Sequence, residues 1–137
     1  MPDNLQVTKA IYDAFAVGEI DAILAAFHPQ IEWNAAENFI YSDESPYRGK
    51  EAVLTGVFRR LANDWDDFRM IPEEIRGSGD LIIANGRMRG KFKATGVVIN
   101  AQFVQVFQFQ DGKLIRCQMY TDTAQFRDAV YQKTAGA

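Results

Sequence analysis

The first half of the chain has apolar residues at the three- and four-residue spacing that is typical of amphipathic helices. Thr8, Ile11, Tyr12 and Phe15 recur in this way and predict a helix over residues 4–17. Two more helices are predicted over residues 19–27 and 50–64, separated by an extended segment at 31–35 and a polar loop at 36–49.

The ends of these helices are indicated by residues with special backbone preferences. Asn4 is expected to cap the first helix, and Gly18 to end it in the left-handed conformation that glycine adopts without strain. Pro29 is expected to end the second helix, because proline cannot continue the helical hydrogen-bond pattern.

The second half of the chain changes to the alternating pattern of strands. Asp111 and Gly112 form a strong hairpin signal, because this dipeptide supplies the positive φ angles of a tight turn. Strands of ten or more residues are longer than usual, so we expect β-bulges that bend them. Extended segments are predicted at 67–76, 81–93, 97–110 and 113–121, followed by a short helix at 123–131. This order predicts an α+β fold, with three N-terminal helices packed on a strongly curved, mostly antiparallel sheet.

The composition supports one domain that spans residues 1–137. Hydrophobic residues make up 47% of the chain and aromatic residues 12%, including ten phenylalanines. Because aromatic side chains bury large areas, this supply is enough for a core and, in addition, for a lined cavity or an interface between subunits.

The charged residues argue against a nucleic-acid-binding surface, since the formal net charge is −3. The densest basic stretch is Arg87, Arg89, Lys91 and Lys93, whose spacing of two places them on one face of a strand. We expect this face to be solvated. The alternative, in which Arg87 or Arg89 turns inward to hold an anionic group, stays open.

The sequence also bears on the compartment. A single cysteine, Cys117, excludes an intrachain disulfide, which fits a reducing environment. The N-terminus has neither the basic start nor the apolar run of a signal peptide, and no apolar run is long enough to span a membrane. We therefore expect a cytoplasmic protein without a membrane partner.

Four short segments, together with the order of elements, resemble the nuclear transport factor 2-like superfamily. They are residues 18–22 (GEIDA), 47–53 (YRGKEAV), 111–113 (DGK) and 120–124 (YTDTA). Within this superfamily the segments resemble SnoaL-like and ketosteroid-isomerase-related proteins in particular. The resemblance implies a cone-shaped, cystatin-like fold with a pocket between sheet and helices, a fold that serves enzymes, binding domains and scaffolds alike.

Asp122 is the candidate catalytic residue. In the resembling polyketide cyclases, an aspartate ends the last strand and acts as general acid and base inside the cavity. Strand alternation places Gln118, Tyr120 and Asp122 on one face, and a carboxylate in an apolar pocket is suited to proton transfer. The alternative is a capping box with Gln125 at the start of the last helix.

Two other reactions of the resembling families are matched only in part. The steroid isomerases use a tyrosine in the first helix and an aspartate base near the first strand. Here Tyr12 lies one position from the matching tyrosine, and the place of the base, near Ala35, has no aspartate. The epoxide hydrolases use an arginine between two aspartates. Asp122 with Arg87 or Arg89 supplies one acid and the arginine, but the second acid is missing.

Aromatic and polar side chains on the predicted inner faces are the candidate substrate-binding residues. Gln105 is of special interest, because an amide on an aromatic strand face must be hydrogen-bonded if it is buried. The sequence has no cluster of His or Cys and no glycine-rich phosphate loop, so we expect neither a metal nor another cofactor. The candidates are Tyr12, Trp33, Phe58, Met88, Phe103, Gln105, Phe107, Gln118 and Tyr120.

Two functions of different classes fit these residues. The first is a cofactor-free enzyme that uses general acid and base chemistry to isomerise, cyclise or hydrate a small apolar substrate. The second is a non-catalytic domain that binds a small hydrophobic molecule or forms dimers. We expect a homodimer through the outer sheet face around Val104 and Val106, which is too apolar for a bare surface.

Overall fold

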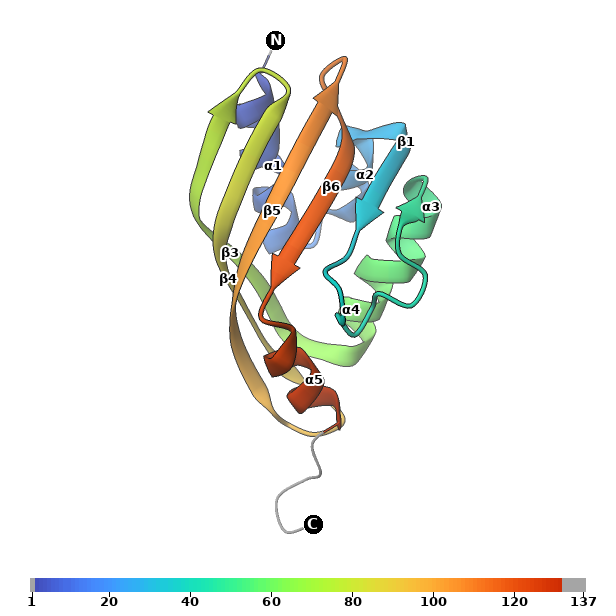
Figure 1. Ribbon diagram of the computed structural model, residues 1–137, viewed down its shortest axis with the longest axis vertical. Coiled ribbons are helices and arrows are strands. Elements are labelled where there is room, and N and C mark those ends of the chain that lie inside the picture. Colours follow the sequence, from blue (N-terminus) through green and yellow to red (C-terminus); the bar gives the residue numbers. More distant parts are fainter. Residues whose placement is uncertain (1, 132–137) are drawn as a thin grey trace.

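The computed structural model describes residues 2–131 and has the predicted α+β architecture. The N-terminal helices lie behind the curved sheet in the view of Figure 1, and the last helix follows the final strand. The helices predicted from the apolar stripes are confirmed, and the third contains a wider, π-helical turn. The helices are α1 (Asn4–Ala16), α2 (Ile20–Ala26), a continuous segment made of α3 (Lys50–Val53), η1 (Leu54–Phe58) and α4 (Arg59–Asp64), and α5 (Thr123–Tyr131).

Helix α1 is capped by Asp3, so the prediction for Asn4 is wrong. The Oδ1 atom of Asp3 accepts a hydrogen bond from the backbone N–H of Gln6 at 2.8 Å, and Gln6 Oε1 accepts one from the N–H of Asp3 at 3.0 Å. In a capping box the glutamine lies three positions after the cap residue, so Gln6 pairs with Asp3 and not with Asn4. The side chain of Asn4 instead donates to the carbonyl of Gly79 at 2.8 Å. Gly18 follows the helix at a φ of 74°, as predicted.

The strands form one sheet in the order β2-β1-β6-β5-β4-β3. Strand β1 is parallel to β6, and the other neighbours are antiparallel. Pro29 lies inside β1 and does not end α2, because that helix already ends at Ala26. The strands are β1 (Phe27–Asn34), β2 (Tyr47–Arg48), β3 (Trp65–Ser78), β4 (Leu81–Phe92), β5 (Val98–Gln110) and β6 (Lys113–Thr121).

Bulges bend the long strands, as the strand lengths predicted. Strand β3 has an extra residue opposite β4 at two places, between Asp66 and Arg69 and between Pro72 and Glu74. Gly86 of β4 lies opposite the second bulge, where the absence of a side chain lets the backbone of β3 approach closely. These bends curl the sheet around the helices.

The core lies between the helices and the inner face of this curled sheet. Every second residue of β5 from Ile99 to Phe109 is buried, which shows that one face of the strand points inward along its whole length. Thr8, Ile11 and Tyr12 of α1 are buried against the core, as the stripe predicted. Within residues 2–131, no helix combines the length and the apolar character that crossing a membrane requires.

Candidate ligand-binding site

A small, partly enclosed cavity lies between the helices and the inner face of the sheet. Helices contribute one side of its wall, and β1, β3, β4, β5 and β6 contribute the other. The space that it leaves open is about 20 Å³, close to what a single water molecule needs. The lining residues are Phe15, Trp33, Ala35, Phe39, Val57, Phe58, Leu61, Phe68, Met70, Met88, Gln105 and Met119.

Gln105 carries the one side-chain amide among these lining residues, and the indole N–H of Trp33 is the other polar group of the lining side chains. It lies on the inner face of β5 between Phe103 and Phe107, and only 2% of it is exposed. Its Oε1 atom accepts a hydrogen bond from the hydroxyl of Tyr12 on α1 at 2.5 Å. The prediction that a buried amide at this position is hydrogen-bonded is therefore confirmed.

Tyr12 is held in this pair by packing as well as by the hydrogen bond. Its ring stacks on Phe107, with ring centroids 6.1 Å apart and planes inclined by 14°, and lies 6.2 Å from the ring of Phe103. Burial, with a smaller contribution from nearby Cys117, raises the pKa of Tyr12 far above that of a free tyrosine. The hydroxyl therefore keeps its proton and acts as the donor to Gln105.

The amide nitrogen of Gln105 has no hydrogen-bond partner among residues 2–131. No fully enclosed side-chain nitrogen or oxygen in this part of the chain lacks a partner, so the nitrogen must border open space. Because Gln105 is almost completely buried and lines the cavity, that space is the cavity. The two N–H groups of Gln105 are thus hydrogen-bond donors at the cavity wall, in addition to the indole N–H of Trp33.

Seven of the predicted substrate-binding residues lie at or beside the cavity, in two groups. Four predicted residues line the cavity itself, and three are buried beside it, where they form or support the polar pair. The four are Trp33, Phe58, Met88 and Gln105, and the three are Tyr12, Phe103 and Phe107.

Gln118 and Tyr120 lie on the opposite face of the sheet, so the prediction that they line the pocket is wrong. Ile115 is an extra residue of β6 in its pairing with β5, and such a bulge shifts the alternation of side chains by one. As a result Cys117 and Met119 face inward and are buried, whereas 57% of Tyr120 is exposed.

Asp122 lies outside the cavity and is exposed, so the prediction that its carboxylate faces the pocket is also wrong. Its Oδ2 atom accepts a hydrogen bond from Nε2 of Gln125 at 2.9 Å, and its backbone N–H donates to the carbonyl of Gln102 at 3.3 Å. The bulge in β6 again explains the difference, because it reverses the faces of the residues that follow it. A catalytic role for Asp122 stays a prediction that the cavity does not support.

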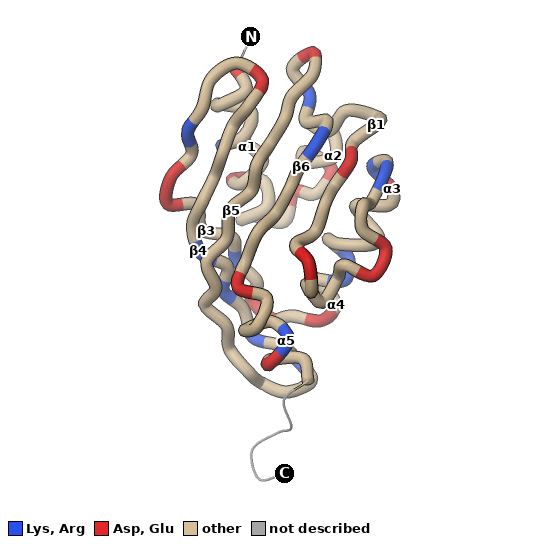
Figure 2. Tube along the Cα trace, viewed as in Figure 1, with Lys and Arg blue, Asp and Glu red and all other residues tan. Residues whose placement is uncertain are grey.

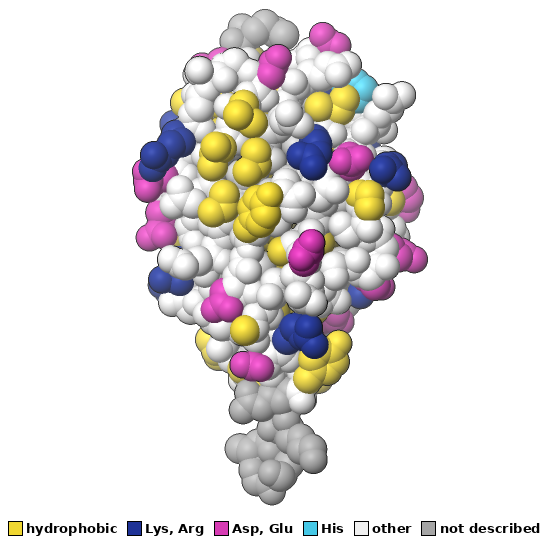
Figure 3. All heavy atoms as spheres, in the orientation of Figure 1, with side chains coloured by type: hydrophobic (Ala, Val, Ile, Leu, Met, Phe, Trp, Pro, Cys, Tyr) yellow, Lys and Arg dark blue, Asp and Glu magenta, His cyan; other side chains and the backbone are white. Residues whose placement is uncertain are grey.

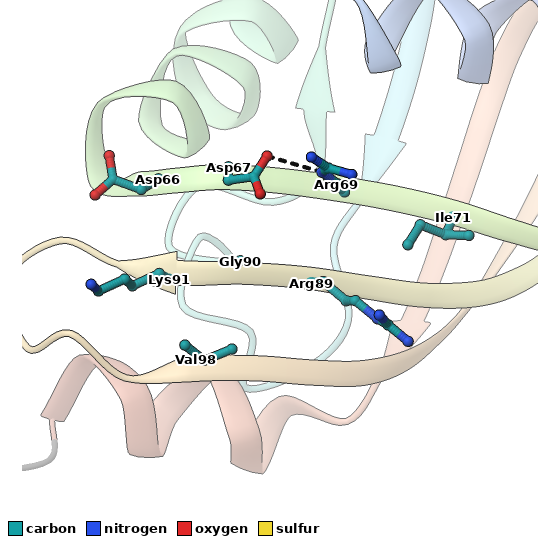
Figure 4. A pocket seen from close by; sticks show the side chains of 8 residues that line it. All are labelled: Asp66, Asp67, Arg69, Ile71, Arg89, Gly90, Lys91 and Val98. Carbon is teal, nitrogen blue, oxygen red and sulfur yellow. Dashed lines mark hydrogen bonds and ion pairs between the residues drawn. The ribbon is translucent and has the colours of Figure 1, made fainter.

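The basic face of β4 also points away from the cavity (Figure 4). Arg89 and Lys91 line an open groove of about 440 Å³ on the outer side of the sheet, where Arg69 is paired with Asp67 at 2.9 Å. Arg87 precedes Arg89 by two residues on the same strand and therefore shares its face. The expectation that this face is solvated is confirmed. Neither Arg87 nor Arg89 reaches the cavity, as an epoxide hydrolase mechanism would require.

Phe39, Phe68, Met70 and Met119 line the cavity although the sequence did not single them out. Phe39 lies in the segment predicted as a polar loop, where it is buried together with Tyr41. In the sequence, Phe39 and Tyr41 form a short aromatic cluster, which indicates burial. The polar residues on both sides led to the prediction of an exposed loop.

Two buried tyrosines, Tyr41 and Tyr47, hold the segment between β1 and β2 in place. The hydroxyl of Tyr41 donates to Asp64 Oδ2 at 2.6 Å and accepts from Nε1 of Trp65 at 3.2 Å, while the hydroxyl of Tyr47 donates to the carbonyl of Tyr41 at 2.7 Å. Burial, together with the hydrogen bond to Asp64, raises the pKa of Tyr41. The segment therefore presents Phe39 as a fixed part of the cavity wall.

Charged residues outside the cavity form ion pairs where β6, β1 and β2 lie side by side (Figure 2). Glu32 of β1 accepts hydrogen bonds from Nδ2 of Asn34 at 3.1 Å and Nε of Arg116 at 3.2 Å, and it pairs with Arg48 at 3.4 Å. The bond from Asn34, followed by the two arginines, holds the pKa of Glu32 below its ordinary value. These partly exposed pairs join the strands at the sheet edge and contribute little to stability.

The chemistry that the cavity wall can offer is narrow. Its lining contains no carboxylate, imidazole, thiol or amine, so no lining side chain can act as a general acid or base near neutral pH. Among residues 2–131, moreover, no three His, Cys, Asp or Glu side chains gather where they could hold a metal ion. What the cavity can do is enclose an apolar group and donate a hydrogen bond from Gln105.

Comparisons with known proteins agree with the architecture. The family model described as SnoaL-like domain matches residues 8–117. Among solved structures, the chain is similar to an NTF2-like protein from Burkholderia thailandensis, with 27% identity, a TM-score of 0.90, and coverage of 95% of this chain and 98% of that one. Among curated proteins, none matches the chain.

Two more distant solved structures share the fold. One is a protein from Jannaschia sp. whose name assigns it to the SnoaL-like polyketide cyclases, with 16% identity, a TM-score of 0.80, and coverage of 95% of this chain and 92% of that one. The other is TerC, co-crystallised with polyporic acid, with 23% identity, a TM-score of 0.81, and coverage of 93% of this chain and 97% of that one.

Proposed function

The chain belongs to the family of SnoaL-like domains, and from this premise we propose that its cavity binds a small, uncharged molecule with an apolar body and one acceptor oxygen. The observation that carries the proposal is the Gln105 amide, whose oxygen accepts the hydrogen bond of Tyr12 and whose nitrogen borders a largely apolar cavity. A few polar groups on an apolar wall are the usual composition of a small-molecule site.

The unpaired amide nitrogen gives the cavity a preference for a carbonyl or another neutral acceptor. A buried donor without a partner costs free energy, which a ligand oxygen can recover by accepting the hydrogen bond. A single water molecule matches the open space in size, but a buried water makes two to four hydrogen bonds, and the lining side chains offer it only N–H donors, from Gln105 and Trp33.

The wall also supports an uncharged ligand. A carboxylate or an ammonium group would lose its hydration on entry, and the lining has no side chain of opposite charge to compensate for this loss. The arginines and lysine of β4 and the carboxylate of Asp122 lie outside the cavity and offer no such partner there.

Ligand binding agrees with this geometry better than isomerisation, cyclisation or hydration by acid and base catalysis. The lining has no titratable group, and the buried hydroxyl of Tyr12 keeps its proton. The co-crystallisation of TerC with polyporic acid supports a small organic ligand for a chain with this fold.

Matched pairs of ligands that differ by one carbonyl test the proposal. We expect 1-indanone to bind more tightly than indane by about tenfold, since a buried hydrogen bond contributes roughly 1–1.5 kcal/mol. Titration calorimetry and the shift of the melting temperature both report this difference, because a ligand at about 100 times its Kd adds about 2.7 kcal/mol to the free energy of unfolding.

Gln105→Leu is expected to remove the preference for 1-indanone and to leave the affinity for indane unchanged or improved. Gln102→Leu is the matched control, because Gln102 lies on the outer, exposed face of the same strand. The proposal fails if neither ligand stabilises the wild-type protein, or if the preference survives in Gln105→Leu.

We further propose that the outer sheet face joins two copies of the chain. Apolar side chains gather on this face over β4, β5 and β6 (Figure 3). Leu81 is 46% exposed and Tyr120 57% exposed, and Ile83, Val104 and Val106 lie half-buried around them. Apolar side chains grouped on one exposed sheet face, with glutamines between them, favour an interface between subunits.

Val106→Glu is expected to convert this dimer into a monomer, because the substitution places a charge within the apolar face. Light scattering at micromolar concentration measures the mass directly. Gln110→Glu is the control, since it adds the same charge at the exposed end of the same strand. A monomer mass for the wild-type protein would show that the proposed dimer does not form. A dimer that persists in Val106→Glu would show that another surface forms the interface.

A further inference from the structure

Methionine is concentrated at the cavity. The sequence has four methionines, and all three that the structure describes, Met70, Met88 and Met119, line the cavity. They come from three different strands, β3, β4 and β6. Met70 and Met88 are direct cross-strand neighbours, and Met119 is the cross-strand neighbour of Gln105. The sheet side of the cavity therefore carries three methionines, one of which is the neighbour of Gln105.

The aromatic part of the wall is locked by contacts among its own rings. Phe58 contacts Trp33, Phe27 and Phe15, with ring centroids 5.7–6.3 Å apart. Phe39 is packed in the same way, with its ring centroid 4.9 Å from that of Phe126. A ring in such a network cannot move without displacing its neighbours, because the interior is close-packed.

The methionines have the opposite character. Methionine is unbranched, has several rotatable bonds, and refills irregular space at low cost, which is why it recurs at surfaces that bind varied partners. Met70 is in addition only partly buried, and it lies on the edge strand β3 between the two bulges of that strand. This side of the wall can change shape while the aromatic side stays fixed.

The size of the cavity makes such a change necessary. About 20 Å³ is open, whereas an engineered apolar cavity that binds benzene has a volume of about 150 Å³. The remaining space has to come from side chains that withdraw. Of the apolar lining side chains that lie outside the network of rings, the three methionines have the most rotatable bonds.

We infer that Met70, Met88 and Met119 determine the specificity of the site by repacking around the ligand, so that one cavity accepts flat, apolar carbonyl compounds from one ring to three rings in size. The inference rests on the proposed function and adds to it the range of ligands. Leucine at these three positions would restrict the site to ligands of one size, since leucine branches at Cγ and has fewer rotamers than methionine.

A graded series of ketones tests this range. Cyclohexanone, 1-indanone and 9-fluorenone have one, two and three rings and carry the same carbonyl group. We expect the wild-type protein to bind all three with Kd values within about tenfold of one another after correction for their solubility in water. We expect the triple variant, with leucine in place of Met70, Met88 and Met119, to retain its affinity for cyclohexanone. Its affinity for 9-fluorenone should fall by more than about tenfold.

Leucine is the suitable replacement because it conserves volume and cores tolerate the exchange. Leu61→Ile is the matched control, as it changes the shape of a lining side chain without touching a methionine. If the triple variant does not fold, Met88→Leu and Met119→Leu are measured singly.

In the wild-type protein, the ¹³C-methyl resonances of the three methionines should shift on binding, in a pattern that differs from ketone to ketone.

The outcomes separate this inference from the function on which it rests. If the wild-type protein binds none of the three ketones, the proposed function fails and the inference fails with it. If it binds ketones of only one size, or if the leucine variant binds the same range, the inference alone is overturned. Methionine resonances that shift identically for all three ketones would overturn it as well, because they would indicate a rigid wall.

Discussion

A Gly86→Ala variant is expected to lose more than about 3 kcal/mol in its free energy of unfolding. In the native backbone the added Cβ would lie 2.0 Å from the carbonyl oxygen of Ile71 and 2.8 Å from Cα of Pro72. These atoms belong to the backbone of β3 at its second bulge, so they cannot move aside by a change of rotamer. The strand would have to separate from β4, and the bend that curls the sheet would open.

Equilibrium unfolding in urea, followed by the fluorescence of Trp33 and Trp65, measures the loss. Gly90→Ala is the matched control on the same strand, because the nearest atom to its added Cβ would be a ring carbon of Phe68 at 3.0 Å, in a side chain that can shift. A smaller loss is therefore expected for Gly90→Ala. Equal stability of the two variants would show that close approach at Gly86 does not set the curvature.

The elements and their order could be predicted because their signals are local. The stripe of Thr8, Ile11 and Tyr12 and the turn at Asp111 and Gly112 each depend on a few neighbouring residues, and the structure confirms both. The N-cap was misplaced by one position, since two adjacent residues, Asp3 and Asn4, have side chains of the same capping ability. Only the position of Gln6 distinguishes them.

The faces of β6 could not be predicted, because they depend on pairing with a distant strand. Ile115 is an ordinary strand residue in the sequence, and its role as the extra residue of a bulge emerges only from the register between β5 and β6. That single insertion moves Gln118 and Tyr120 to the outer face and brings Met119 to the cavity. The inward direction of Gln105 was predicted correctly, because no bulge interrupts the alternation of β5 on either side of it.

A Tyr12→Phe variant is expected to be less stable than the wild-type protein by about 1–3 kcal/mol, although it removes a single oxygen. The reason is that Gln105 Oε1 accepts its hydrogen bond from Tyr12 and would remain buried without a donor. Gln105→Leu leaves the hydroxyl of Tyr12 unpaired instead and should cost a similar amount. The double variant Tyr12→Phe, Gln105→Leu replaces both partners by apolar groups, so its loss should be well below the sum of the two single losses.

The pH dependence of stability gives a second, independent measure of the same hydroxyl. Burial raises the pKa of Tyr12 in the folded protein, whereas in the unfolded chain the hydroxyl ionises near its ordinary pKa of about 10. Above that pH the unfolded state loses a proton that the folded state retains, so stability is complete below pH 10 and falls as the pH rises further. Tyr12→Phe should reduce this slope by about 1.4 kcal/mol per pH unit.

Part of the alkaline loss should remain in Tyr12→Phe, because burial also raises the pKa values of Tyr41 and Cys117. Tyr131→Phe is the matched control, since that ring is 72% exposed and belongs to α5, not to the proposed dimer face. Urea unfolding between pH 8 and pH 11 should therefore separate Tyr12→Phe from both the wild-type protein and Tyr131→Phe. If Tyr12→Phe and Tyr131→Phe show the same slope, the Tyr12 hydroxyl is not sealed in the core, and Gln105 would then be free to turn its amide away from the cavity.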